Sequence, residues 1–159
     1  MNAPLKLATA FPADAPAEEC EVDYGRACPT IPNGIYRVVF VHHETAYAFR
    51  TAKVFLWFRI IEEGPYFGRM IYAAYRARKL LSKAGKGGRF KLASGSELFR
   101  TICRVLDVKA RPDRISVREF QKKVLRVAVR TVKTDYRQRE LPEALRYSVV
   151  EDIIERETG

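Results

Sequence analysis

Apolar and polar side chains alternate from residue 52 to residue 61, and this alternation predicts a β-strand with one buried face. Successive side chains of a strand point to opposite sides, so the two faces can be separated by position. One face is wholly apolar and holds Ala52, Val54, Leu56, Phe58 and Ile60. The other face is mixed and holds Lys53, Phe55, Trp57, Arg59 and Ile61. We therefore expect the first face to line a core and the second to face outward.

The rest of the chain predicts four more strands and one helix. Runs of β-branched and aromatic residues predict strands at 35–41, 68–76, 124–134 and 147–154. A helix is predicted over 94–107, because a serine can cap its start and apolar residues recur at helical spacing. Residues 116–122 favour a helical turn. The glycine-bearing segment 78–91 and the polar segment 133–146 predict loops.

Three strands, a helix and two further strands follow one another in this order, which is the order of the OB-fold. The predicted fold class is therefore all-β, a closed five-stranded barrel with one helix between its third and fourth strands. An open α+β sheet is the alternative. The predicted organisation is a flexible acidic arm at 1–32, the nucleic-acid-binding domain at 33–155 and a short tail at 156–159.

Charge is distributed unevenly along the 159 residues, whose formal net charge is +10. Residues 1–32 hold two basic and five acidic side chains, and residues 151–159 hold one basic and four acidic side chains. The central residues 33–150 hold 26 basic and 10 acidic side chains. The central domain therefore carries all of the basic excess, which indicates an anionic polymer as its partner.

The mixed face of the strand at 52–61 is the strongest candidate for binding that polymer. Aromatic rings stack on the bases of single strands while nearby cations contact phosphates, and the OB-fold binds on its second and third strands. Phe55, Trp57 and Tyr72 are the predicted stacking residues, with Tyr75 in reserve if the register of 68–76 slips by one. The predicted backbone contacts are Lys53, Arg59, Arg76, Arg126 and Arg130 on strands, Arg78, Lys79, Lys86 and Arg89 in the first loop, and Lys133, Tyr136, Arg137 and Arg139 in the second.

Other chemistries have weaker support. Residues 84–88 hold three glycines and a lysine but lack the Gly-Lys-Ser/Thr ending of a phosphate loop. The spacing of Cys20 and Cys28, with His42 and His43 adjacent, does not match a structural zinc site. The carboxylates of the basic domain are scattered. We therefore expect a protein that is not an enzyme and uses no metal or cofactor.

Location and membrane contact are predicted from what the sequence lacks. No run of eighteen apolar residues occurs, so no membrane-spanning helix is predicted. Residues 1–10 do not have the pattern of a secretory signal, and the three cysteines are an odd number. The expectation is a cytoplasmic protein.

Three stretches resemble a family of phage and mobile-element OB-fold proteins that bind single-stranded DNA or accompany recombination. Residues 34–38 resemble the opening strand of that family, 63–69 its hairpin between the second and third strands, and 120–127 with 147–150 its last two strands. The resemblance covers about residues 32–155. It implies a protein that coats single strands during replication or recombination.

The function expected from the sequence is therefore sequence-tolerant binding of single-stranded DNA. Two alternatives stay open. One is an RNA-binding OB module, since the same face can serve either polymer. The other is a protein-interaction or assembly factor of a plasmid or phage system, in which the outward aromatics contact a protein. Replication or recombination proteins are possible partners, and the sequence leaves homo-oligomer formation open.

Overall fold

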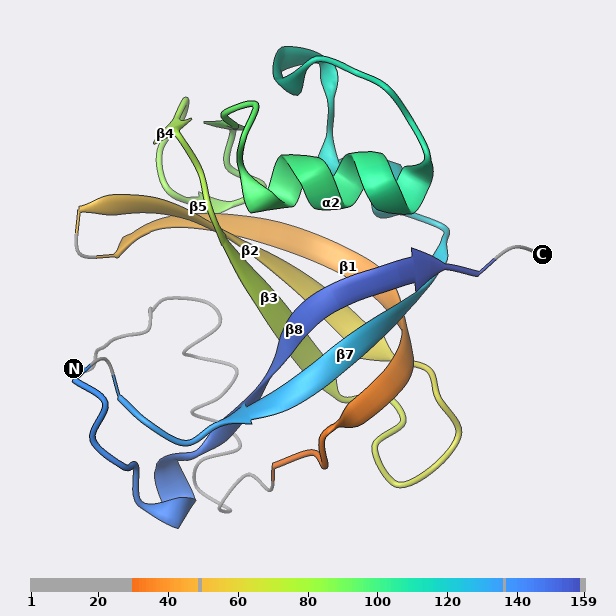
Figure 1. Cartoon of the computed structure of the whole chain (residues 1–159), viewed down its shortest axis with the longest axis vertical. Coiled ribbons are helices and arrows are strands. Elements are labelled where there is room, and N and C mark those ends of the chain that lie inside the picture. The colour runs from red at the N-terminus through yellow and green to blue at the C-terminus, as the bar shows by residue number, and fades with distance from the viewer. Residues whose placement is uncertain (1–29, 49, 136, 158–159) are drawn as a thin grey trace.

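The computed structural model describes residues 30–48, 50–135 and 137–157, which form a mostly β fold with one α-helix (Figure 1). The predicted arm at 1–32 lies outside the described residues except for its last three. The long strands are β1 (Gly34–Ala48), β2 (Thr51–Ile60), β3 (Met70–Arg76), β7 (Val124–Val132) and β8 (Tyr147–Arg156).

Shorter elements lie between these strands. The helix is α2 (Glu97–Leu106), and it is preceded by the two-residue strands β4 (Lys79–Leu80), β5 (Gly85–Lys86) and β6 (Phe90–Lys91). Three 3-10 turns are η1 (Pro112–Arg114), η2 (Val117–Phe120) and η3 (Glu143–Leu145). The predicted mostly β class, its single helix and the order of the long strands are confirmed for the part of the chain that the structure describes.

The strand predicted at 35–41 extends to Ala48 as β1, and two further predictions differ from the structure. The segment 78–91 was predicted as a loop, and this is wrong: it contains β4, β5 and β6, with β4 paired to β6 and β5 paired to β1. Ile31, which was assigned to the arm, is 2% exposed and belongs to the core. Its backbone amide donates to Ser148 Oγ (2.9 Å), and Ser148 Oγ donates back to its carbonyl oxygen (3.1 Å). The packed domain therefore begins before the predicted residue 33.

The long strands form one antiparallel sheet in the order β3-β2-β1-β7-β8. The sheet twists and curls, so that β3 and β8, which end this order, come into contact (Figure 1). A hydrogen bond joins the side chains of Tyr72 on β3 and Tyr147 on β8. Within the described ranges no backbone ladder joins β3 to β8, so the strand order is left open at this seam.

The core fills the inside of the curled sheet and is covered at one end by α2 (Figure 1). Val54, Leu56, Phe58 and Ile60 of β2 are each 0% exposed, as their alternation predicted. The corresponding faces of the other strands supply the rest, with Phe120 of η2 also fully buried. Burial of apolar surface on this scale is the main stabilising force of such a fold.

Helix α2 begins and ends where its sequence dictates. Ser96 is the N-cap, and its side chain accepts a hydrogen bond from the amide of Phe99 (3.1 Å). Asp107 adopts the left-handed conformation (φ 53°) and ends the helix. Leu98 and Ile102 are fully buried, and Arg104 donates to the carbonyl oxygens of β8 at Ile153 and Ile154 (2.8 Å each). These contacts fix the helix over one end of the sheet.

A buried pair of hydroxyls also joins α2 to β3, and it provides a test of this packing. Tyr75 is 5% and Thr101 is 4% exposed, and their side chains are hydrogen-bonded; burial raises the pKa of Tyr75. Thr101→Val leaves the Tyr75 hydroxyl buried without this partner and is expected to cost about 1–3 kcal/mol of unfolding free energy. Tyr75→Phe combined with Thr101→Val should cost less than the sum of the single changes, as measured by urea denaturation. Additive costs would show that the two hydroxyls are not coupled.

Candidate nucleic-acid interface

The outer face of β2 and β3 carries a cluster of aromatic rings. Antiparallel pairing sets Trp57 opposite Tyr72 and Phe55 opposite Ala74. The ring centroids of Trp57 and Tyr72 are 5.1 Å apart, and those of Phe55 and Tyr72 are 5.6 Å apart. Tyr75 points to the other side of β3 and lies in the core. The register therefore places Tyr72, and not the reserve candidate Tyr75, beside the aromatic residues of β2.

Trp57 differs from the prediction in its exposure. It lies on the predicted face, but it is only 2% exposed, so its indole offers no open surface for a base in this structure. The imidazole of His42 stacks on it (centroids 6.3 Å apart, planes at 19°), and Tyr72 lies on the neighbouring strand. Its Nε1 is buried and has no hydrogen-bond partner among the residues that the structure describes. Phe55 and Tyr72 are half-buried and are the rings that a ligand can reach on this face.

A carboxylate lies at the centre of this face. Glu44 on β1 is opposite Phe55 and is 5% exposed. Its Oε2 is 3.2 Å from Nε2 of His42. A buried acid at this point disfavours a phosphate over the rings, because like charges repel most strongly where solvent screening is weak. The centre of the face is therefore suited to bases, and phosphates would lie toward its edges.

Three predicted cations surround the rings. Arg59 and Arg76 are exposed and Lys53 is half-buried. Lys53 and Arg76 lie directly opposite each other on β2 and β3. Within the described ranges none of the three belongs to a salt bridge. These three cations can therefore bind an external anion. A cation that is already paired with a carboxylate is less able to do so.

The predicted cations of β7, unlike those of β2 and β3, lie beside carboxylates. Arg126 donates to Glu155 (3.1 Å), and Arg130 Nε is 3.9 Å from Glu151 Oε1. Both carboxylates come from the adjacent strand β8, so each guanidinium already has an acid beside it. Arg126 and Arg130 therefore differ from Lys53, Arg59 and Arg76, which make no salt bridge within the described part of the chain.

The glycine-rich segment 85–88 is a tight turn packed on β1. The amide of Gly87 donates to the carbonyl oxygen of His43 (2.9 Å), and His43 Nε2 donates to the carbonyl oxygen of Gly88 (2.9 Å). The Thr45 hydroxyl, 3% exposed, bonds to the backbone of Gly85. Burial is the main cause of the lowered pKa of His43. This neutral, ordered anchor holds the segment that carries the exposed predicted cations Arg78, Lys79, Lys86 and Arg89.

The segment 133–146 is organised around Asp135. Its carboxylate accepts hydrogen bonds from the amides of Arg137 (2.8 Å) and Arg139 (2.9 Å), and it is 3.3 Å from the guanidinium of Arg139. The amide of Arg139 is the largest cause of the lowered pKa of Asp135. Lys133 is exposed. The predicted residue Tyr136 lies outside the described residues.

Sequence reasoning missed several exposed residues near these elements. Tyr47, near the end of β1, is 62% exposed, and the exposed Arg50 that follows adopts a left-handed conformation (φ 64°) in the β1–β2 turn. Lys91 belongs to the basic segment 78–91 that the sequence indicated, but its place opposite Lys79 across β4 and β6 was not foreseen. An aromatic residue followed by a cation between two extended runs was an available signal for Tyr47 and Arg50. The Lys79–Lys91 pair had none, because it depends on the unpredicted hairpin.

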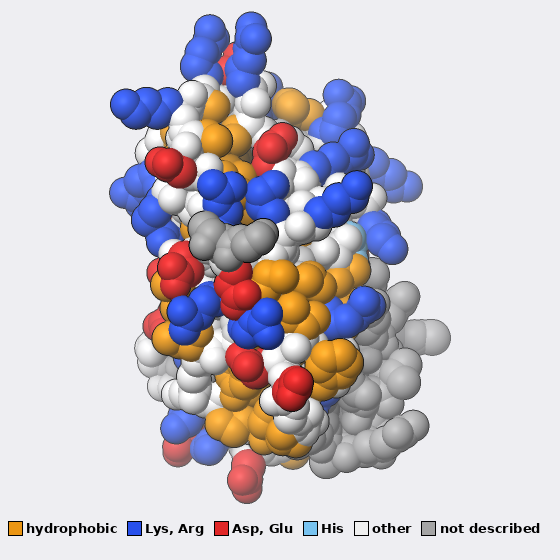
Figure 2. Space-filling model, turned by 90° about the vertical axis from the view of Figure 1, so that its right-hand side faces the viewer, with side chains coloured by type: hydrophobic (Ala, Val, Ile, Leu, Met, Phe, Trp, Pro, Cys, Tyr) orange, Lys and Arg blue, Asp and Glu red, His pale blue; other side chains and the backbone are white. Residues whose placement is uncertain are grey.

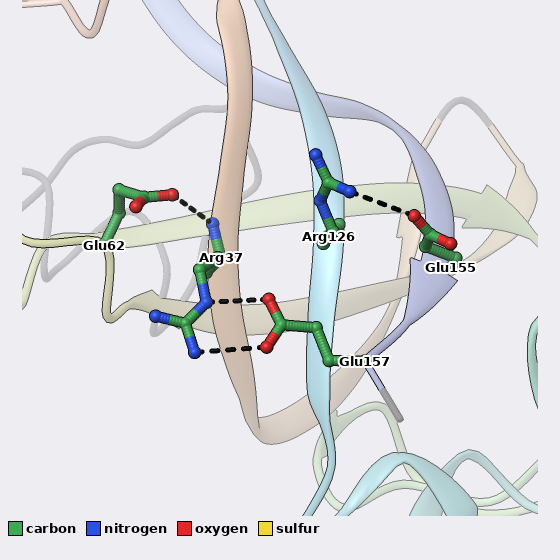
Figure 3. Close-up of polar contacts among 5 residues, drawn as sticks. All are labelled: Arg37, Glu62, Arg126, Glu155 and Glu157. Carbon is green, nitrogen blue, oxygen red and sulfur yellow. Dashed lines mark hydrogen bonds and ion pairs between the residues drawn. The ribbon is translucent and has the colours of Figure 1, made fainter. Parts of the chain in front are cut away.

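On the face that Figure 2 shows, basic residues are concentrated at one end. On the side that faces right in Figure 1, Lys and Arg gather over the end that carries α2, whereas acids mix with them across the middle (Figure 2). An open hollow of about 540 Å³ is lined by Ile35 and six charged residues. There Arg37 makes a bidentate pair with Glu157 (2.7 and 3.1 Å), and Glu62 accepts from the amide of Arg37 (Figure 3). The positive and negative side chains that line the hollow therefore balance one another.

Comparisons with known proteins do not identify the chain. No family model, no curated protein and no solved structure matches it. Among the residues that the structure describes, no three His, Cys, Asp or Glu side chains gather as a metal site would require. In the same residues, no helix has the length and apolar character needed to span a membrane.

Proposed function

We propose that this protein binds single-stranded nucleic acid, with DNA as the preferred polymer, on the outer face of β2 and β3. The observation that carries the proposal is the combination on one face of two reachable rings, Phe55 and Tyr72, with three cations that have no salt bridge among the described residues. Rings of this kind stack on bases of any sequence, and the cations attract the phosphates. Binding of this kind tolerates many sequences.

The strand order supports the proposal as well. The order β3-β2-β1-β7-β8 is the one an OB barrel would have if its sheet were opened between the third and fifth strands. The Tyr72–Tyr147 hydrogen bond lies at that seam. In an OB-fold the second and third strands form the binding face, and those strands correspond to β2 and β3. A role in coating single strands during replication or recombination would fit such a module.

The first experiment is a titration of the full chain with an oligo-dT strand, followed through tryptophan fluorescence at two salt concentrations. Trp57 is the only tryptophan and contacts Tyr72, so a base that stacks on Tyr72 should change its emission. If three phosphates are neutralised, the logarithm of the association constant should fall with the logarithm of salt concentration with a slope of about −2 or steeper.

The same titration separates the alternatives. Competition with an oligo-U strand of equal length compares RNA with DNA, and tighter binding of the RNA would reassign the polymer. Absence of binding by fluorescence and by filter retention, at low salt and with the protein folded, would refute the proposal. In that case the aromatic face would be more consistent with a protein partner.

A further inference from the structure

Two pairs of like charges lie directly opposite each other across neighbouring strands. Lys53 faces Arg76 across β2 and β3, and Lys79 faces Lys91 across β4 and β6. Like charges in this position destabilise a sheet. No carboxylate within the described residues makes a salt bridge with any of the four. An external anion would relieve the repulsion in both pairs.

A third pair of this kind shows how the fold neutralises such charges elsewhere. Arg37 faces Arg126 across β1 and β7. Glu157 lies 2.7 Å from Arg37, and Glu155 lies 3.1 Å from Arg126, so each guanidinium has its own carboxylate (Figure 3). The compensated pair lies in the hollow, away from the aromatic rings. The uncompensated pairs lie on β2–β3 and on the hairpin that follows β3.

The two uncompensated pairs are connected by continuous backbone structure. The amide of Ala77 donates to the carbonyl oxygen of Ala52 (2.9 Å), and the amide of Arg78 donates to the carbonyl oxygen of Lys91 (2.7 Å). Two residues separate Arg76 from Lys79, which limits the distance between their α-carbons to about 11 Å. Arg76 and Lys79 therefore lie on one short run of chain, and Lys53 and Lys91 lie opposite them on the neighbouring strands.

The hairpin that carries the second pair is held in place. The amide of Leu81 donates to the carbonyl oxygen of Arg89 (2.8 Å), and the amide of Arg89 donates to Ser82 Oγ (2.8 Å). The glycine turn at 85–88 joins the hairpin to β1 through His43 and Thr45. Charges on an ordered element lose less conformational freedom on binding than charges on a mobile loop.

We propose that Lys53, Arg76, Lys79 and Lys91 form a phosphate path, on which the backbone of the bound strand lies while its bases turn toward Phe55 and Tyr72. The inference rests on the proposed function and extends it, because it assigns the course of the strand from β2–β3 onto the β4–β6 hairpin. The four cations of the path contact successive phosphates of the strand and do not contact the edges of its bases.

The test uses two double variants, Lys53→Gln with Arg76→Gln and Lys79→Gln with Lys91→Gln, and the single variant Arg126→Gln as the control. The ligands are an oligo-dT strand and an abasic strand of the same length, which has the phosphates but no bases. Each double variant should reduce the steepness of the oligo-dT salt dependence by about 1.4, the effect of two phosphates, and should weaken both ligands by a similar factor. Arg126→Gln should leave the slope unchanged, because that side chain is already paired.

The outcomes distinguish the path from the proposed function. Oligo-dT binding with an unchanged slope in both double variants would overturn the path and leave the nucleic-acid proposal standing. Binding of the abasic strand that depends on the four cations, without any preference for oligo-dT, would support the path and contradict base stacking. Without ligand, the double variants should melt at a higher temperature than the wild type at low salt, because the repulsion is removed. A lower melting temperature in both would count against the path.

Discussion

Replacing Phe55 and Tyr72 together by alanine is expected to weaken oligo-dT binding by at least about 30-fold. Each ring that stacks a base contributes about 1–3 kcal/mol, so two rings contribute about 2–6 kcal/mol. The salt slope should remain that of the wild type, because the cations are untouched. The measurement is a fluorescence or anisotropy titration at fixed salt with a labelled strand.

Two conservative variants control for structural damage. Tyr72→Phe keeps the ring and removes only the hydroxyl that bonds to Tyr147, so its binding should stay close to the wild type. Phe55→Leu keeps much of the apolar volume without the aromatic face, so it should bind more weakly than the wild type. Thermal melts must show that all variants are folded. Full affinity in the double alanine variant would exclude stacking on these rings and would remove the main support for the proposed function.

Gly88→Ala is expected to destabilise the protein by about 1–3 kcal/mol. A Cβ at residue 88 would overlap Thr45 Oγ1 and would lie 3.1 Å from the carbonyl oxygen of Gly85. Thr45 is 3% exposed and β-branched, so its side chain has little freedom to turn away. The turn would have to separate from β1, and the hairpin that carries Lys79 and Lys91 would move with it. Urea denaturation should show the loss of stability, and oligo-dT affinity should fall as well.

The matched control is Gly95→Ala. A Cβ there meets no atom within 4 Å and the backbone is not left-handed, so stability should be unchanged or should rise by up to about 1 kcal/mol. Thr45→Ala combined with Gly88→Ala removes the overlapping hydroxyl and should cost less than the sum of the two single changes. If Gly88→Ala is as stable as Gly95→Ala, the turn is not packed against β1 as described.

The faces of β2 and the position of α2 were predictable because they depend on local rules. Side chains alternate with a period of two along a strand, so the apolar set from Val54 to Ile60 had to share one side. A serine before an apolar helical stripe caps the first turn, and Ser96 does so. The identity of the outward residues on β2 followed from the same alternation.

The state of the candidate site was decided by contacts between distant segments. Trp57 is on the predicted face, yet His42 and Tyr72 from neighbouring strands lie against it and it is buried. Arg126 and Arg130 are outward as predicted, but acids of β8 pair with them. No local pattern specifies which strand lies beside which.

By itself, then, the sequence determined the five long strands, the helix, the inner face of β2 and the basic character of the central domain. These properties depend on neighbours a few residues away, whose geometry the backbone sets. The tertiary structure alone decided which rings a ligand can reach, which of the described cations have a carboxylate beside them, and that the glycine turn at 85–88 packs on β1. Those properties depend on burial and on Coulomb partners from distant strands, because desolvation and charge pairing arise only when the sheet assembles.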